Sequence, residues 1–184
     1  MLTVHEHVWP YYLPLVGDSM FELGGKWNSG LGLTYKSYFE SIGFRHVSVD
    51  WAGQKYGALN RDLRQPQWPE FGQFDMVTNI GTTEHVQGQA GVWENIHRLT
   101  KAGGVLVTLT PYYDGKSWWW HGEYYPTEAF FESFAELNGW EIERMDRVLP
   151  PPHTNLQARL RKLADGPFTM PDESLIHYNQ MRAR

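Results

Sequence analysis

The sequence contains no cysteine, which excludes a disulfide framework and any metal site built from thiolates. It also contains no apolar run that approaches the roughly 20 residues of a membrane-spanning helix. Its N-terminal residues 1–9 have neither the basic start nor the apolar core of a signal peptide. We therefore expect a cytoplasmic protein that has no membrane partner.

Positive charge is also scarce: the sequence has 16 Lys and Arg residues and 21 Asp and Glu residues, which gives a net charge of -5. A general nucleic-acid binder more often carries a basic surface, so we expect no nucleic-acid partner. Hydrophobic residues make up 41% of the 184 residues and charged residues 20%, which is typical of a globular protein. The length suits one domain over residues 1–184, with a core at about 18–163 and a tail at 164–184.

The sequence is organised around one stretch, Asp18–Lys26, which reads as a short buried strand followed by a glycine pair. Glu22 lies where the strand ends, and Gly24 and Gly25 let the backbone turn tightly and pass close to a ligand. The pattern predicts a nucleotide-type binding site at this turn. An ordinary turn from a strand into a helix remains the alternative.

The rest of the sequence alternates between strand and helix patterns, which predicts an α/β fold. The expected strands are His46–Asp50, Ala58–Leu63, Phe74–Asn79, Val105–Leu109, a strand from Trp140 and a last strand over residues 156–161. A helix is the alternative for the last segment. The expected helices are Ser29–Ile42, with Gly43 as its C-cap, Gln89–Thr100, and a helix from the N-cap Thr127 to Asn138.

The block from Phe74 to Pro111 is the most specific part of the sequence: FDMVTNIGTTEHV, a helix ending in Arg-Leu, a Lys-x-Gly-Gly turn and a further strand. Together with Asp50 at the end of the second strand, it resembles the class I S-adenosyl-L-methionine (SAM)-dependent methyltransferases, over roughly residues 18–148. The resemblance implies a Rossmann-like seven-stranded sheet that is mostly parallel, with an antiparallel hairpin at its C-terminal edge and helices on both faces. One departure is the glycine motif, because the family usually has three spaced glycines, whereas here Gly24 and Gly25 are followed only by a displaced Gly30.

Acidic and amide side chains fall at successive strand ends, where an open α/β sheet binds its ligand. The resemblance implies that Glu22 or its neighbours approach the methionine part of SAM, Asp50 the ribose and Asp62 the adenine. It also implies that Asn79 and Ile80 line the methyl donor. Trp51 packs either on the adenine or on the core, and Asp62 is alternatively a solvated turn residue. The predicted cofactor-binding residues are Glu22, Gly24, Gly25, Asp50, Trp51, Asp62, Leu63, Asn79, Ile80 and Gly81.

The long connection from Tyr112 to Pro126 is expected to act on the substrate, because loops of this length are usually functional. It contains three adjacent tryptophans, Trp118–Trp120, followed by His121 and Glu123. We interpret it as a substrate wall and lid, with an aromatic plug as the alternative. Candidate catalytic residues are His121, His85 and Glu123, with Glu84 as a further candidate base. His85 alternatively orients the start of its helix, and His121 is alternatively a solvated loop residue.

Some members of the family hold a divalent cation with a Glu-x-x-Glu-His motif after the fourth strand. Here Glu84 and His85 match, but Gly81 replaces the first glutamate, so no metal is expected. The expected activity is methyl transfer from SAM to an oxygen or nitrogen of a small-molecule, glycan or other sugar-containing acceptor. The alternative is an inactive methyltransferase fold that binds SAM or a nucleotide, or serves as a scaffold subunit.

Overall fold

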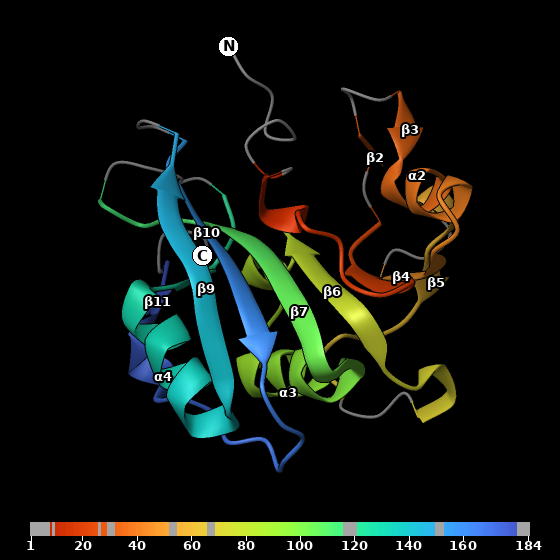
Figure 1. The fold of residues 1–184 in the computed structure, drawn as a ribbon. Helices are drawn as coiled ribbons and strands as arrows, with labels where there is room; N and C mark the ends of the chain where they lie inside the picture. The colour runs from red at the N-terminus through yellow and green to blue at the C-terminus, as the bar shows by residue number, and fades with distance from the viewer. Residues whose placement is uncertain are drawn as a thin grey trace.

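The computed structural model describes residues 8, 10–25, 27–28, 32–51, 55–65, 69–115, 121–149 and 153–179. Its centre is a seven-stranded sheet in the order β5-β4-β1-β6-β7-β10-β9 (Figure 1). The strands are β5 Leu59–Asn60, β4 Arg45–Asp50, β1 Ser19–Leu23, β6 Phe74–Ile80, β7 Thr100–Pro111, β10 Asn155–Lys162 and β9 Trp140–Val148. The first five run parallel, and β10 pairs antiparallel with both β7 and β9, as the opposite direction of its arrow shows. The expected sheet and its C-terminal edge hairpin are confirmed.

Helices cover both faces of the sheet, and alternate residues of each central strand serve the two layers. Met20 and Met76 pack with helix α2 (Tyr35–Ser41) and with the helical turn at residues 10–12. Phe21 and Val77 point to the opposite face and pack with α3 (Gln89–Leu99) and α4 (Glu128–Asn138), around the fully buried Trp93. The alternation in β1 and β6 thus builds two cores, as expected for a doubly covered sheet.

The helix expected over Ser29–Ile42 is wrong in its first half. A small hairpin of β2 (Trp27–Asn28) and β3 (Leu33–Thr34) precedes α2, which begins only at Tyr35. Thr34 is the N-cap, because its hydroxyl accepts a hydrogen bond of 2.9 Å from the Ser37 amide. Gly32, with a φ of 66°, lies in the turn of this hairpin. Glycine in the interior of a helix is destabilising, so this position does not favour an earlier helix start.

The last strand of the sheet resolves the alternative between a strand and a helix at residues 156–161. This segment lies between two strands as part of β10, and its buried Arg159 extends toward the N-terminal segment. The guanidinium donates to the carbonyls of Tyr11 at 2.8 Å, Tyr12 at 3.2 Å and Pro14 at 3.0 Å, and it contacts Glu143 at 2.5 Å. Arg159 therefore anchors the N-terminal segment to the sheet.

The C-terminal tail contains a helical turn and a short strand. After the single turn η4 (Glu173–Leu175), the strand β11 (Ile176–Tyr178) pairs antiparallel with β8 (Tyr124–Pro126), which lies in the long connection after β7. The remaining short turns are η1 Lys55–Gly57, η2 Pro69–Phe71 and η3 Thr83–His85. The tail thus contacts the segment in which the sequence places substrate-binding residues.

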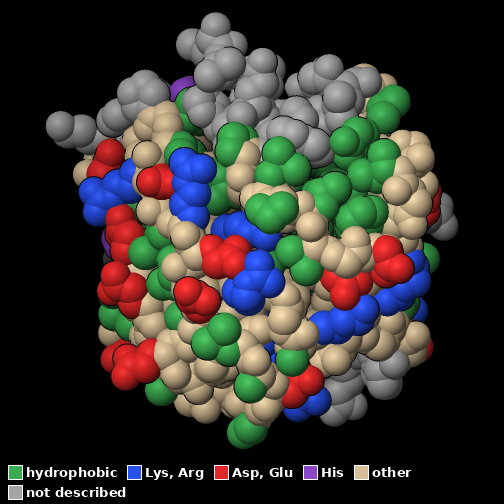
Figure 2. All heavy atoms as spheres, viewed as in Figure 1, with side chains coloured by type: hydrophobic (Ala, Val, Ile, Leu, Met, Phe, Trp, Pro, Cys, Tyr) green, Lys and Arg blue, Asp and Glu red, His purple; other side chains and the backbone are tan. Residues whose placement is uncertain are grey.

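The surface carries mixed charge on the face that Figure 2 shows, where acidic and basic side chains lie among one another. Ion pairs at the β9 edge of the sheet include Arg144–Asp146 at 2.6 Å on β9 and Arg161–Glu143 at 2.5 Å between β10 and β9. Among the described residues, the longest helices, α3 and α4, have 11 residues each, and none is long and apolar enough to cross a membrane.

Candidate functional site

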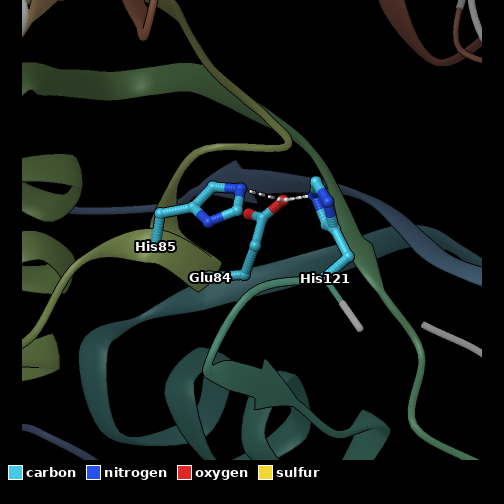
Figure 3. Close-up of side chains that lie close together, drawn as sticks. All are labelled: Glu84, His85 and His121. Carbon is cyan, nitrogen blue, oxygen red and sulfur yellow. Dashed lines mark ion pairs between the residues drawn. The ribbon is translucent and has the colours of Figure 1, made fainter. Parts of the chain in front are cut away.

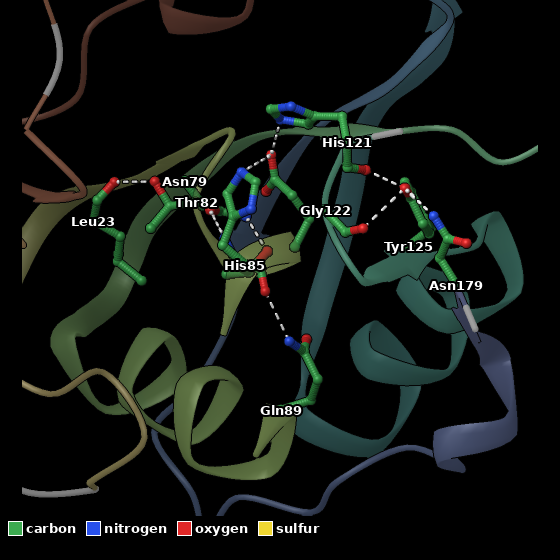
Figure 4. A network of polar contacts seen from close by, with 11 residues as sticks. Leu23, Asn79, Thr82, His85, Gln89, His121, Gly122, Tyr125 and Asn179 are labelled. Atoms are coloured by element: carbon green, nitrogen blue, oxygen red, sulfur yellow. Dashed lines mark hydrogen bonds and ion pairs between the residues drawn. The ribbon is translucent and has the colours of Figure 1, made fainter. Parts of the chain in front are cut away.

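The turn after β1 is locked by contacts that require a glycine at position 24. Gly24 has a φ of 73°, and its amide donates to the Val49 carbonyl at 2.7 Å. The Thr82 hydroxyl donates to the Leu23 carbonyl at 2.9 Å (Figure 4), so the loop after β6 lies directly on this turn. A Cβ on Gly24 would be 2.3 Å from Thr82 Oγ1. The two loops therefore form one floor at the carboxyl ends of β1, β4 and β6.

A cleft of about 720 Å³ opens above this floor. Predicted residues that line it come from both the cofactor set and the catalytic set: Gly24, Asp50, Trp51, Asp62, Leu63, Gly81, His85, His121 and Glu123. Trp51 is 79% exposed, so it does not pack in the core. An exposed indole at the edge of a cleft can stack on a flat ligand.

Two acids lie at neighbouring strand ends on one side of the cleft. Asp50 is the last residue of β4 and lies opposite Asn60 of β5. Asp62 follows β5, and both of its carboxylate oxygens accept from Arg64, at 2.9 Å from Nε and 2.7 Å from Nη2. This bidentate contact lowers the pKa of Asp62, so the group is anionic at neutral pH. The Arg64 backbone amide also donates to Oδ1, at 3.0 Å, so Arg64 holds both oxygens of Asp62 beside the cleft.

Four residues of the predicted cofactor set, Glu22, Gly25, Asn79 and Ile80, are buried and do not line the cleft. Glu22 Oε2 lies 3.6 Å from His46 Nε2. Burial, with a contribution from Lys36, lowers the pKa of His46 to about 3, so the imidazole is neutral and this contact with Glu22 carries no positive charge. It is not an ion pair at neutral pH.

Asn79 acts on the shape of the next loop. Its side-chain oxygen accepts from the Thr83 amide at 3.1 Å, and its amide donates to the hydroxyls of Thr83 at 2.9 Å and Thr108 at 3.0 Å. From α3, the Gln89 side chain donates to the Thr83 carbonyl at 2.8 Å. These bonds fix the turn η3 and thereby set the direction of the next side chain, Glu84.

Glu84 and two histidines form a compact cluster (Figure 3). The carboxylate of Glu84 lies between the two imidazole rings, with Oε1 at 3.7 Å from His85 Nε2 and 3.5 Å from His121 Nε2. Glu84 is fully buried, whereas the His85 side chain is 42% exposed and that of His121 is 38% exposed. One ligand-type atom from each of the three residues lies within 4.8 Å of the other two.

The backbone that follows His121 packs directly against Glu84. The Glu123 amide donates to the Glu84 carbonyl at 2.7 Å, and a Cβ on Gly122 would be 2.8 Å from Glu84 Cγ. The buried Tyr125 hydroxyl donates to the His121 carbonyl (Figure 4). Asn179 closes the arrangement, because its side chain donates to the Tyr125 hydroxyl at 3.2 Å and its backbone amide to the Glu123 carbonyl at 2.8 Å.

Some residues of the cleft were not among the predicted site residues: Asn60, Arg61, Arg64, Thr82, Val86 and Gln87. The spacing Asp62-x-Arg64 was a local signal for an ion pair. The contact of Thr82 with Gly24 had no such signal, because the two residues are distant in sequence. The tryptophans at positions 118–120, and the lid or plug role predicted with them, lie outside the described residues.

The strand order, the antiparallel edge hairpin and the acid-lined cleft at the carboxyl ends define the fold of the class I SAM-dependent methyltransferases. In agreement, a family model described as a methyltransferase domain matches residues 36–108. No curated protein sequence matches this chain significantly. The resemblance read from the sequence is confirmed.

Solved structures of low sequence identity share this fold. The 1,6-didemethyltoxoflavin-N1-methyltransferase of Burkholderia thailandensis, with bound 1,6-didemethyltoxoflavin and S-adenosylhomocysteine, has a TM-score of 0.64 and 14% identity, over 86% of this chain and 77% of that chain. The N-methyltransferase NodS of Bradyrhizobium japonicum WM9, in complex with S-adenosylhomocysteine, has a TM-score of 0.61 and 13% identity, over 86% and 85%. An O-methyltransferase segment of StiE has a TM-score of 0.58 and 11% identity, over 85% and 73%.

Proposed function

We propose that this protein is a SAM-dependent methyltransferase that acts on an oxygen or nitrogen of a small-molecule or sugar-containing acceptor. The observation that carries the proposal is the two-sided cleft. Gly24, Asp50 and Asp62 line one part of it, and His121 and Glu123 line another. The first group suits the nucleoside part of SAM, and the second group suits an acceptor.

The reaction requires mainly correct placement. The acceptor lone pair attacks the methyl carbon, the carbon–sulfur bond breaks with its electron pair staying on sulfur, and the sulfonium becomes the neutral thioether of S-adenosylhomocysteine. The protein has to hold the two reactants in line and exclude water. An oxygen acceptor also loses a proton, for which His121, His85 and Glu123 are the nearby candidate bases.

One observation favours the second candidate, an inactive fold that binds SAM or serves as a scaffold. The hairpin of β2 and β3 follows the glycine pair, and α2 begins only at Tyr35. The turn after β1 is therefore not followed at once by a helix N-terminus, which in many nucleotide sites attracts an anionic group. Binding at this end of the cleft then depends more on Asp50, Asp62 and the loops.

The two candidates differ in turnover. The protein is incubated with methyl-labelled SAM and separate panels of phenols, amines and glycans, and release of S-adenosylhomocysteine is measured. We expect release with at least one panel, and a loss of release in Asp50→Asn. A protein that binds SAM but releases no S-adenosylhomocysteine with any panel would support the scaffold function instead.

A further inference from the structure

We propose that Glu84, His85 and His121 bind one divalent transition-metal cation, of the type of Zn²⁺, Mn²⁺ or Fe²⁺, at the edge of the cleft. Two imidazole nitrogens and one carboxylate are a donor set that such cations prefer over Mg²⁺, which favours oxygen ligands. The proposal reverses the expectation from the sequence. That expectation rested on the missing glutamate at Gly81 and did not include His121 as a ligand.

The first argument is the free-energy cost of burying the Glu84 carboxylate. Glu84 is 0% exposed, and within the described part of the chain neither of its oxygens has a hydrogen-bond partner. Burying a carboxylate without such partners is energetically unfavourable. In proteins this free-energy cost is offset by a paired charge, a metal ion or protonation of the group. The two histidine nitrogens lie beyond hydrogen-bond length, at 3.5 Å and 3.7 Å from Oε1. A cation bound by the three groups would compensate the buried charge of Glu84.

The second argument is the spacing. Ligands that bind Zn²⁺ at about 2.0–2.1 Å in a tetrahedral arrangement lie roughly 3.4 Å from one another. The two distances from Glu84 Oε1 are close to this value, and all three ligand atoms lie within 4.8 Å of one another. The two rings are nearly perpendicular, at 80°, with their centroids 4.7 Å apart, and Figure 3 shows the carboxylate between them.

The third argument is that two of the groups are positioned by the fold. The bonds of Asn79 shape the turn that carries Glu84. The bonds of Tyr125 and Asn179 hold the backbone of residues 121–123. Gly122 allows this close approach, because it has a φ of 71° and any Cβ there would meet Glu84. A preformed set of ligands of this kind lowers the entropy cost of binding a cation.

A cation here would also define the acceptor, and this step rests on the proposed function. Three protein ligands leave coordination positions open, as in catalytic metal sites, and both histidines line the cleft. An acceptor hydroxyl bound there would lose its proton more easily, because the cation stabilises the oxyanion. The acceptor oxygen would then form the bond to the methyl carbon as the carbon–sulfur bond breaks, and the proton would pass to solvent. The favoured acceptor class is a phenol or alcohol with a second oxygen nearby, which could also bind the cation.

The test is a metal titration of the full chain after removal of metal with a chelator and dialysis. Zn²⁺ is followed by calorimetry and Co²⁺ by its visible absorption. We expect one equivalent to bind. Glu84→Gln and His121→Asn should each weaken binding by more than the roughly 10–100-fold that loss of an outer-shell partner costs. His153→Asn, which changes an exposed histidine outside the cluster, is the matched control. His5→Asn/His7→Asn tests whether these two histidines, which lie two residues apart in the sequence, bind the cation instead.

The outcomes separate clearly. Absence of stoichiometric binding overturns the proposal, and so does binding that survives both Glu84→Gln and His121→Asn. Binding that is lost only in His5→Asn/His7→Asn also overturns it. If Glu84→Gln does not fold, the partly exposed His121 still provides the test. SAM binding to the metal-free protein is measured separately, so a failure of the metal site is distinguished from a failure of the proposed function.

Discussion

Glu84 Oε1 lies 3.5 Å from His121 Nε2, although the two residues come from connections that follow different strands of the sheet. Glu84 belongs to the turn after β6, and His121 belongs to the connection after β7. The carboxyl ends of adjacent parallel strands meet at one edge of a sheet, which brings these connections together. The C-terminal tail then holds them in register through Asn179 and Tyr125.

The first prediction concerns this contact with the tail. Tyr125→Phe removes the hydroxyl that bonds to the His121 carbonyl and accepts from Asn179. The change should loosen residues 121–123 and cost about 1–3 kcal/mol, the usual range when a buried hydrogen-bond partner is lost. Hydrogen exchange of the Glu123 amide, which bonds to the Glu84 carbonyl, should become faster.

The matched control is Tyr178→Phe, because Tyr178 lies on the same tail and is 40% exposed. It should leave the exchange of the Glu123 amide unchanged. If Tyr125→Phe leaves it unchanged as well, the tail does not hold this segment.

The second prediction concerns the floor of the cleft. Gly24→Ala should destabilise the protein by about 2–5 kcal/mol, because it combines a left-handed backbone with a steric clash. A Cβ there would be 2.3 Å from Thr82 Oγ1, so Thr82→Ala should relieve part of the clash. Urea unfolding of the two single variants and the double variant measures this coupling. We expect the double variant to lose less than the sum of the two single losses, whereas strict additivity would contradict the contact.

The third prediction concerns stability in acid. The folded pKa of His46 is about 3, below its ordinary value of 6.5, so between these pH values the unfolded chain binds one more proton than the folded chain. The stability that depends on a neutral His46 is therefore present above about pH 6.5 and is lost as the pH falls toward 3. Between pH 7 and pH 5 this group should remove about 2 kcal/mol from the free energy of unfolding, at up to about 1.4 kcal/mol per pH unit.

His46→Gln isolates this effect, because it keeps a neutral polar side chain that does not titrate. Urea unfolding at pH 7 and pH 5 should show a smaller acid loss in the variant than in the unchanged protein. Other titrating groups, including the buried His97, whose pKa is lowered by burial, are common to both proteins and cancel in the comparison. Equal losses in the two proteins would show that His46 accepts a proton in the folded state.

The sheet was predictable from the sequence because its strands are defined by local patterns. Alternation in β1 and β6, the cap at Thr127 and the acids at the strand ends are all short-range signals. The start of α2 was less predictable, since apolar residues recur at helical spacing over residues 33–42. The helix nevertheless begins only at Tyr35, because Gly32 lies in the preceding turn and Thr34 is the N-cap.

The cluster at the cleft was predictable only in part. Glu84 and His85 are adjacent in sequence, so their motif was visible, and His121 was identified separately as a candidate base. That the three lie together depends on the pairing of β11 with β8 and on the bonds of Tyr125, which no local pattern shows. The contact of Thr82 with Gly24 depends in the same way on two loops that meet only in the folded sheet.

The most direct test of the central claim is calorimetry of SAM and S-adenosylhomocysteine with the unchanged protein, with Asp50→Asn and with Glu141→Gln. Asp50 lines the cleft at the end of β4, whereas Glu141 is an exposed residue of β9. The account predicts binding of one equivalent, weakened in Asp50→Asn by about 1–3 kcal/mol for a lost charge-assisted hydrogen bond and unchanged in Glu141→Gln. No binding to the unchanged protein, or equal affinity in Asp50→Asn with its fold intact, would contradict it.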